Sequence, residues 1–436
     1  LARIGGATKG VLHGALDAEI AKELFAAIAE SRRIDLRKGE LVSSRLTAFE
    51  EVRDQAPDAD LTPVTPAIER ANSSIRFGER YVLKLIRRVA PGPSHEVEMG
   101  RFLTDRAHFP RAPRLAGTIE ARSAAGDSSA VALLHAFVPH QMDGWRQMLG
   151  ELERYFDAAV AWDVGQAQVD RALELSGTTV PEEARRTVGT ALEAASTLGR
   201  RTAELHLTLA SDAAASAFGT ASIDQTWIDA MATRARRQAE MTLSSLAAAA
   251  DRPAPIATPL IETLIGSRDR LMAAVDAFAR TIPAGLQLTR IHGAYDLGQV
   301  LLSEADYLVI DFEGDPALPM DERRRLNTPL RDVANMVRSF QYAAGAGLWA
   351  RITIAPQDGE RMAAWSRWWH TWTTVSFLAA YRSTAAGAAF LPADTSGMEA
   401  VIRLLLIEQS LTEIRRELAD RPEYVWIPVQ AVVDLI

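Results

Sequence analysis

The chain has 436 residues, of which 48% are hydrophobic and 24% charged, as expected for a soluble globular protein of two or three domains. Its formal net charge of -8 gives no general basic field for nucleic acid or anionic lipid, and the absence of cysteine excludes disulfides, thiolate metal sites and cysteine nucleophiles. No uncharged apolar run approaches the about 18 residues of a membrane helix and no secretory signal is present, so we predict a cytoplasmic protein without membrane or nucleic-acid partners.

The first 66 residues predict a small N-terminal subdomain in two pieces. Apolar residues recur near helical spacing over 15–34, and 35–49 has strand-like and turn-like character. The stretch 50–69 is acidic and interrupted by proline, which indicates a linker. Because the chain begins with Leu1, we expect it to be a segment of a longer protein.

A β-rich part follows at 67–142. Residues 68–88 predict a strand, a turn at 77–79 and a second strand. Residues 94–106 then predict a helix, and 129–139 a buried strand.

The remainder, 143–436, is mostly alanine-rich and amphipathic. Helices are predicted within 143–209, 223–282, 328–350, 359–386 and 396–420. A small β-rich front followed by a large helical back predicts an α+β fold of two lobes with a cleft between them.

Lys84 is the first residue whose surroundings indicate chemistry. It stands on the second predicted strand, and Glu98 follows about fourteen residues later on a helix. This is the spacing at which kinases hold ATP phosphates with a lysine that a glutamate orients, although an unrelated surface pair is the plain alternative. The loop at Asn72, Ser73 and Ser74 is not glycine-rich, but its hydroxyl and N–H groups suit phosphate binding.

Asp311 follows the apolar run YLVI and opens the sequence DFEG. A carboxylate at the end of a buried strand suits Mg²⁺ that bridges nucleotide phosphates, and Gln299 supplies a second, neutral oxygen at the start of another apolar run. An aspartate in an ordinary turn is the alternative. Lys84, Glu98, Gln299 and Asp311 occur in the order of these roles, which favours a kinase-like scaffold that binds ATP and Mg²⁺.

Two histidines and a tryptophan-rich segment are assigned to structure. His292, in an HG turn, is expected to support the loop through backbone hydrogen bonds, and His206 is expected to be buried among leucines. Trp365, Trp368, Trp369 and Trp372 recur at helical spacing, which is typical of core rather than of a sugar-binding platform.

Several segments together resemble the maltokinase family, which transfers the γ-phosphate of ATP to the 1-hydroxyl of maltose in the route from trehalose to α-glucan (glycogen). They are NSSIRFGERYVLKLIRR, EVEMGRFL, FVPHQMDGW, LGRRTAELHLTLAS, HGAYDLGQVL, VIDFEGDPALPMDERR and PLRDVANMVRSFQYAA. The resemblance implies a bilobal eukaryotic-protein-kinase-like fold, as in aminoglycoside phosphotransferases, with a cap subdomain at 1–66. The opening RIGGATKGVLHGALD resembles the junction where such a domain follows trehalose synthase, which implies that enzyme as a partner in cis or in trans.

The resemblance also implies roles for residues. Lys84 would contact the nucleotide phosphates and pair with Glu98, while Gln299 and Asp311 would ligate Mg²⁺. The strand through LLHAFVP would lead into a hinge that receives adenine. The acceptor would be a small sugar, maltose or a relative of it.

The catalytic loop departs from the family pattern HGDxHLGQ. Ala294 stands where the family has the aspartate that accepts the proton of the attacking hydroxyl, and Asp296 replaces its second histidine. Two residues of extended chain span up to roughly 7 Å, so Asp296 does not simply take over the role of a base that must lie within about 3 Å of its proton. Because phosphoryl transfer depends chiefly on positioning and charge neutralisation, the loss predicts a weakened kinase before a dead one.

The C-terminal part departs as well. Gln409 and Thr412 in EQSLTE replace a lysine and a tyrosine of an EKALYE-like segment that faces the sugar in the family. Trp426 is a further candidate at the sugar pocket. Arg331 and Asp332 are expected to form an internal ion pair, and the run DERRR at 321–325 to be solvated.

Two hypotheses follow from these residues. One is an ATP-dependent sugar kinase of the maltokinase type with a changed acceptor side. The other is a catalytically silent kinase-like module that binds nucleotide or sugar, or that regulates a trehalose synthase partner.

Overall fold

The computed structural model describes residues 2–3, 9–10, 18–65, 72–124, 126–163, 165, 173–175, 177–212, 217–219, 221–249 and 256–436. The chain divides into two compact units. Unit 1 comprises Leu1–Gln141 and Ser303–Arg325, and unit 2 comprises Met142–Leu302 and Leu326–Ile436. The segment 303–325, which carries Asp311, therefore groups with the N-terminal residues. The division into 1–66, 67–142 and 143–436 stays a prediction.

Unit 1 is built on a seven-stranded sheet in which each strand is antiparallel to its neighbours. In spatial order the strands are β3 (Arg33–Leu36), β4 (Gly39–Arg45), β8 (Leu115–Arg122), β9 (Ser128–Ala136), β7 (Tyr81–Leu85), β6 (Ser73–Phe77) and β5 (Pro63–Val64). β3 and β4 come from the segment expected to form a cap, and here they extend the sheet. A separate two-stranded pair, β1 (Ala2–Arg3) with β2 (Lys9–Gly10), lies near the N-terminus.

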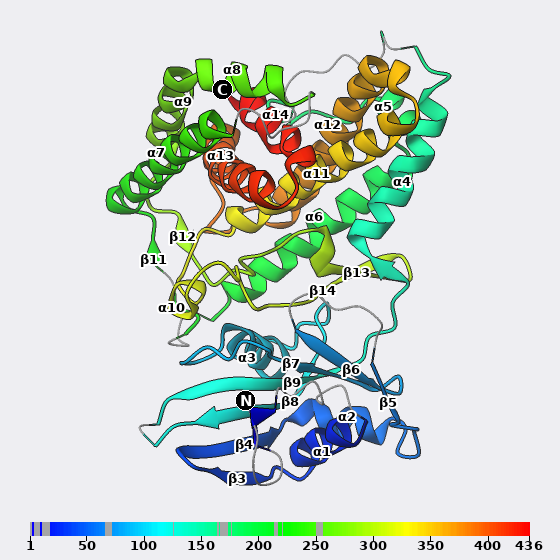
Figure 1. The fold of residues 1–436 in the computed structure, drawn as a ribbon, viewed down its shortest axis with the longest axis vertical. Coiled ribbons are helices and arrows are strands. Elements are labelled where there is room, and N and C mark those ends of the chain that lie inside the picture. Colours follow the sequence, from blue (N-terminus) through cyan, green and yellow to red (C-terminus); the bar gives the residue numbers. More distant parts are fainter. Residues whose placement is uncertain are drawn as a thin grey trace. The chain divides into compact units, whose positions relative to one another are not determined.

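The helices of unit 1 cover the two faces of this sheet (Figure 1). α1 (Ala18–Ala29) and α2 (Thr47–Asp54) pack on the face that carries Leu83, while α3 (His95–Arg101) packs on the other face through Val97. Successive residues of a strand point to opposite faces, so Lys84 points to the side of α3. The alternation of apolar residues in β7 thus brings a lysine to the helix that follows it.

Several expectations for unit 1 are confirmed, and one is wrong. β6, β7 and the turn at Gly78, whose φ is +55°, match the expected strand, turn and strand, apart from 68–71, which lie outside the described residues. α3 continues into a π-helical turn at Phe102–Arg106, and β9 matches the expected buried strand. The expected linker is wrong at its start, because α2 runs to Asp54 and buries Val52 against the sheet.

Unit 2 is mostly helical, as expected. Its longer elements are α4 (Gly144–Ala159), α5 (Glu182–Val188), α6 (Thr190–Leu209), α7 (Gln225–Ala248), α8 (Thr258–Gly266), α9 (Arg268–Thr281), α11 (Leu330–Ile354), α12 (Gly359–Thr384), α13 (Thr395–Asp420) and α14 (Trp426–Leu435). The short strand β10 (Met142–Asp143) pairs with β13 (Val300–Ser303), and β11 (Ala221–Ser222) pairs with β12 (Gln287–Leu288). In unit 1, β14 (Asp306–Val309) and α10 (Met320–Arg323) flank Asp311.

The core of unit 2 lies among its long helices. α12 packs against α6 and α11, and α13 packs against α7, α9, α11 and α14 (Figure 1). Trp365, Trp368, Trp369 and Trp372 are all buried in this core, as expected. Among the described residues, no helix combines the length and the apolar character needed to cross a membrane.

Candidate active site

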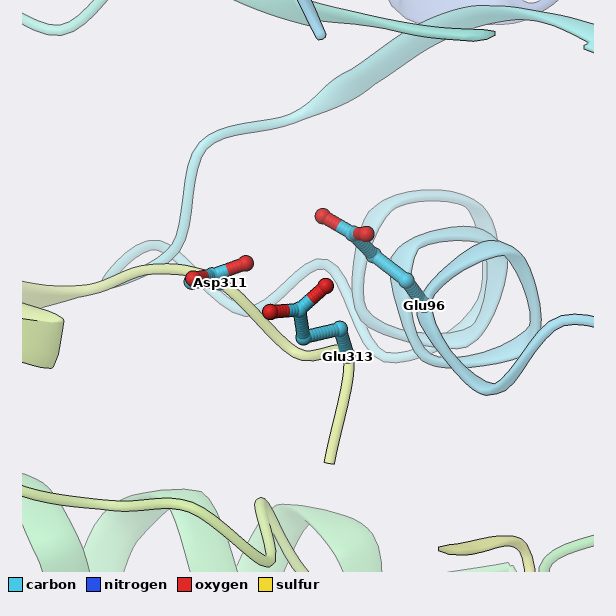
Figure 2. Close-up of side chains that lie close together, drawn as sticks. All are labelled: Glu96, Asp311 and Glu313. Atoms are coloured by element: carbon cyan, nitrogen blue, oxygen red, sulfur yellow. The ribbon is translucent and has the colours of Figure 1, made fainter. Parts of the chain in front are cut away.

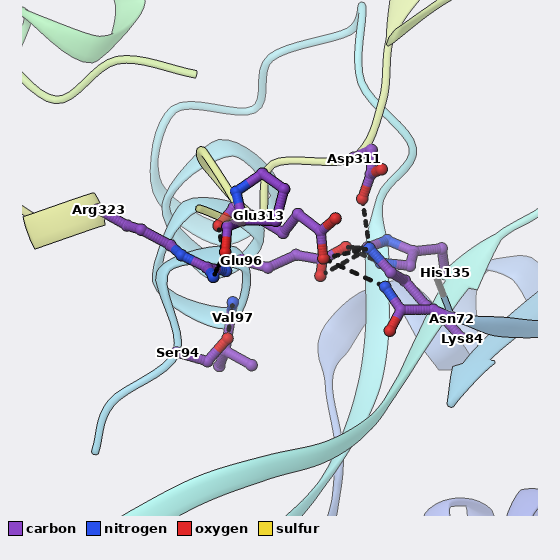
Figure 3. A network of polar contacts seen from close by, with 10 residues as sticks. Asn72, Lys84, Ser94, Glu96, Val97, His135, Asp311, Glu313 and Arg323 are labelled. Atoms are coloured by element: carbon purple, nitrogen blue, oxygen red, sulfur yellow. Dashed lines mark hydrogen bonds and ion pairs between the residues drawn. The ribbon is translucent and has the colours of Figure 1, made fainter. Parts of the chain in front are cut away.

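Lys84 lies at the centre of a polar network in unit 1 (Figure 3). Its Nζ lies 2.9 Å and 3.0 Å from the two carboxylate oxygens of Glu96, contacts Oδ1 of Asp311 and lies 3.7 Å from Oε2 of Glu313. Burial acts to lower the pKa of Lys84, but the charges of the three carboxylates outweigh it and hold the pKa above its usual range. Lys84 is therefore a charged ammonium fixed between α3 and the segment that begins at Asp311.

The prediction that Glu98 pairs with Lys84 is wrong. Lys84 pairs with Glu96, while Glu98 accepts hydrogen bonds of 2.9 Å and 2.7 Å from Arg324. Two residues of an α-helix differ by about 200° around its axis, so both glutamates cannot face one lysine. The sequence carried a usable signal, because Glu96 is spaced for the same helical face as the buried Met99 and Leu103.

Glu96, Asp311 and Glu313 form an acidic cluster in which one oxygen of each lies within 4.8 Å of the others (Figure 2). Three carboxylates face one ammonium, and carboxylate oxygens are the ligands that Mg²⁺ prefers, so the donor set suits that ion. Burial raises the pKa of Glu96, with Lys84 acting in the opposite direction. Sequence reasoning missed Glu96 and Glu313 as members of this site.

The polar loop ahead of β6 is tied to the same network. Asn72 donates a hydrogen bond of 3.1 Å from Nδ2 to Glu313, and the hydroxyl of Ser73 accepts one of 2.9 Å from Arg87. Ser74 pairs with Lys84 in the strand register. The structure thus brings Asn72 and Lys84 to one group of side chains, while the Ser73 hydroxyl is engaged by Arg87.

His135, on β9, is a neighbour that sequence reasoning missed. Its Nε2 lies 3.9 Å from Glu96, and burial lowers the pKa of His135 to about 4. The imidazole is therefore neutral at pH 7 and adds no charge beside Lys84.

The segment after Asp311 is shaped by two arginines of the run that was expected to be solvated. Arg323 donates to the carbonyl oxygens of Leu318, at 2.8 Å, and Pro316, at 2.9 Å, and Arg324 is held by Glu98. These arginines are half-buried. Arg323 lies against Gly314, whose φ of +72° only glycine adopts readily. The expectation of a solvated charge run is therefore wrong for Arg323 and Arg324.

The HG loop belongs to unit 2 and is held by Asp332 of α11. The backbone N–H groups of His292 and Gly293 donate to the two oxygens of Asp332 at 2.8 Å and 2.9 Å. The N–H of Ala294 donates to Nδ1 of His292 at 3.4 Å. The expected ion pair between Asp332 and Arg331 is wrong, because adjacent helical residues diverge and Arg331 pairs with Glu408 at 2.9 Å.

Asp296 and Gln299 lie at the two ends of the next turn. The side chain of Asp296 is exposed and accepts a hydrogen bond of 2.7 Å from the N–H of Gly298, which caps the 3₁₀ turn Leu297–Gln299. Ala294 offers only a methyl group, so no proton acceptor stands at its position. The joint role of Gln299 and Asp311 as metal ligands stays a prediction, since the two residues belong to different units.

The residues expected at the acceptor side lie on α13 and α14. Gln409 donates a hydrogen bond of 3.4 Å to Glu413, which forms an ion pair of 2.5 Å with the buried Arg338. Thr412 is exposed, and its hydroxyl donates back to the carbonyl oxygen of Glu408. Trp426 is 7% exposed.

Comparison with known proteins finds relatives over nearly the whole chain. A glucosamine kinase of Streptacidiphilus jiangxiensis is 25% identical over 414 residues, which are 92% of this chain and 82% of the relative. A glucosamine kinase of Mycolicibacterium smegmatis is 24% identical over 382 residues, 86% and 79% of the two chains. No model of a known protein family matches the sequence.

A solved structure decides the fold. The glucosamine kinase in complex with glucosamine, ADP and inorganic phosphate superposes with a TM-score of 0.66 at 22% identity, over 96% of this chain and 83% of that one. The fold is that of glucosamine kinase. The expected α+β class is therefore correct, and the layout of subdomains stays a prediction.

Proposed function

We propose that the chain is an ATP-dependent sugar phosphotransferase. The observation that carries this proposal is Lys84, a half-buried ammonium held among Glu96, Asp311 and Glu313 in a chain with the fold of a kinase that binds ADP and glucosamine. A fixed ammonium neutralises phosphate oxygens, and carboxylates hold the magnesium that bridges them. Phosphoryl transfer depends chiefly on this neutralisation of charge and on the positioning of the reacting groups.

On the nucleotide side, Lys84 would contact the phosphates, with Asn72, Ser73 and Ser74 as the loop beside them. When bound, Mg²⁺ would neutralise the charge that develops on the transferred group. Asp311 and Gln299 are the proposed ligands, and the acidic cluster supplies Glu313 next to Asp311. Lys84 and the metal would both need Asp311, so Glu96 would be the partner that keeps the ammonium in place.

On the acceptor side, we place glucosamine first, because the relatives and the solved structure are glucosamine kinases. Maltose, which the resemblance to maltokinases implies, is second. Gln409 and Thr412 differ from the lysine and tyrosine of that family, which argues against an unchanged maltose site. A place in trehalose metabolism and a trehalose synthase partner rest on the resemblance alone.

A catalytically silent nucleotide-binding module is the second candidate, and Ala294 is the observation that favours it. A general base contributes typically about 10²- to 10⁴-fold to such a reaction. The carboxylate of Asp296 caps its own turn and does not stand at the position of Ala294. The sugar kinase is therefore proposed with His292 in a supporting role and a slow chemical step.

The experiment that separates the two candidates follows sugar phosphate formation by the native chain. ATP and Mg²⁺ are supplied with glucosamine, maltose, glucose or trehalose, and nucleotide binding is measured by calorimetry on the same sample. The proposal predicts slow transfer to glucosamine. ADP binding with no product from any sugar would favour the silent module. If the chain showed no ADP binding and formed no product, both candidates would be excluded.

A further inference from the structure

β3 is the last strand at one edge of the seven-stranded sheet of unit 1 (Figure 1). Among the described residues it pairs on one side only, with β4, so its other side is open. All its residues are exposed, and the exposed fractions of Ile34 and Leu36 are 46% and 43%. An exposed edge strand that carries apolar side chains is a template on which another strand can pair.

The backbone of β3 directs the polar groups of two residues to this open side. The N–H of Ser43 on β4 donates to the carbonyl oxygen of Arg32, the residue just before β3, at 2.9 Å. In an antiparallel pair, the backbone groups of successive residues point alternately toward the partner strand and away from it. Arg33 and Asp35 therefore each direct an N–H and a C=O away from β4.

The charged side chains of β3 leave one carboxylate without a cation. Asp35 lies directly opposite Glu40 of β4, and like charges in opposite positions are unfavourable in a sheet. Arg33 lies 3.5 Å from Glu40, whereas Asp35 forms no ion pair with any described residue. A strand that paired on the open side with a cation opposite Asp35 would supply the missing charge.

A second copy of β3 supplies this cation in one antiparallel register. When two identical strands pair about a two-fold axis that passes through Ile34, Arg33 lies opposite the second copy's Asp35, and this pair occurs twice. Arg33 and Asp35 are also the residues whose backbone groups point outward, so the same register forms their hydrogen bonds. An axis through Arg33 or Asp35 would set like charges opposite each other, and an axis between residues would break the hydrogen-bond pattern.

The same register brings apolar groups together on the other face of the strand pair. Ile34 would meet the second copy's Ile34 in a non-hydrogen-bonded position, where opposite side chains approach most closely. Leu36 would lie opposite the second copy's Arg32, whose aliphatic stem covers apolar surface while Glu23 and Glu30 of its own chain hold its guanidinium. Both faces of the strand pair are therefore complementary.

We propose that two copies of this chain associate by antiparallel pairing of their β3 strands, Arg33–Leu36, which joins two seven-stranded sheets into one. A strand this short buries less than the about 1,200 Å² of stable interfaces, so we expect a weak dimer with a Kd on the order of 10 to 100 μM. β3 contributes no residue to the candidate active site, so the inference is independent of the proposed function.

Disulfide formation tests the register, because the chain has no cysteine of its own. In Ile34→Cys the two substituted positions lie opposite each other, at a Cα separation of about 4.5 Å, which a disulfide spans. In the matched control Leu36→Cys the two positions lie about 14 Å apart along the strand pair, which a disulfide does not span. On mild oxidation of the full chains, we expect Ile34→Cys to form disulfide-linked dimers at least about tenfold faster than Leu36→Cys.

Charge reversal tests the pairing of Arg33 with Asp35. Asp35→Arg and Arg33→Asp each set like charges opposite each other in a homodimer, so each should raise the Kd measured by sedimentation velocity by about tenfold or more. An equimolar mixture of the two variants sets opposite charges at both positions and should form a heterodimer with a Kd within about threefold of the native one. Asp58→Arg makes the same charge change at an exposed residue outside the sheet and should leave the Kd unchanged.

Equal rates of disulfide formation in Ile34→Cys and Leu36→Cys would overturn the proposal. An effect of Asp35→Arg no larger than that of Asp58→Arg, or no heterodimer in the mixture, would do the same. Sedimentation of the native chain covers the case in which a variant does not fold. A native chain that stays monomeric at about 1 mM would contradict the proposal without any variant, because an interface with the expected Kd is mostly occupied there.

Discussion

At the scale of single residues, the site depends on which carboxylate holds Lys84. Glu96 is almost fully buried and bonds Lys84 through both oxygens, whereas Glu98 faces Arg324. If Glu96 is lost, Lys84 keeps Asp311 and Glu313 as partners, which also offer oxygens to a metal. The ammonium would then compete directly with Mg²⁺.

A pair of isosteric variants tests this assignment. We expect Glu96→Gln to weaken binding of ADP with Mg²⁺ by about tenfold, because a charged hydrogen-bond partner of Lys84 is removed. Glu98→Gln should change it by less than about threefold, since its partner is outside the cluster. Isothermal titration calorimetry measures both, and a larger loss in Glu98→Gln would reverse the assignment.

Asp332 gives unit 2 an acid-sensitive anchor. Its pKa is lowered in the folded chain, so its contribution to stability is complete above the ordinary aspartate pKa of about 3.9 and is lost as pH falls through the folded value below it. In Asp332→Asn, the amide N–H₂ would face the backbone N–H of His292 or of Gly293, which also donates. We expect this variant to lower the free energy of unfolding by about 3 kcal/mol at pH 7. Urea unfolding at pH 7 and at about pH 3 measures this, and we expect the difference between native and variant chains to shrink at the lower pH. A larger difference in the free energy of unfolding between the native and variant chains at about pH 3 than at pH 7 would contradict the prediction.

At the scale of elements, the position of a side chain around the helix axis determines whether it joins the site. Its distance along the sequence from Lys84 does not. The order of Lys84, Asp311 and the HG loop was readable, because strand ends and turns mark them. The choice of Glu96 over Glu98 needed the helical phase of α3. Asp332 was misassigned, because a sequence does not say which distant backbone groups a buried carboxylate will accept.

The contact between α3 and Arg324, the residue that directly follows α10, offers a prediction at this scale. Arg324 binds Glu98 through two nitrogens, and both side chains are partly exposed. We expect Arg324→Ala to lower the free energy of unfolding by no more than about 1 kcal/mol, since exposed ion pairs contribute little. Amide exchange across 311–325 should nevertheless accelerate, because the segment loses its contact with α3. Hydrogen exchange by mass spectrometry measures it, and unchanged exchange there would mean that Arg323 alone shapes the segment.

At the scale of the whole molecule, the sequence predicted the α+β class and the long helices of unit 2, because hydrophobic periodicity alone carries that information. It did not predict that 303–325 groups with the N-terminal unit, or that β3 and β4 extend the main sheet. Such associations depend on packing between segments far apart in the chain. The importance of Ala294 could be inferred only by comparison with the family pattern HGDxHLGQ, which has an aspartate at this position.

Placing a carboxylate at Ala294 tests the central proposal, that this is a sugar kinase that lacks a general base at this position. Sugar phosphate formation from ATP, Mg²⁺ and glucosamine is compared in the native chain and in Ala294→Asp. We predict slow transfer by the native chain and a gain of about 10²-fold or more in the variant, the contribution of a general base. Normal ADP binding with no sugar phosphate from either chain would contradict the account.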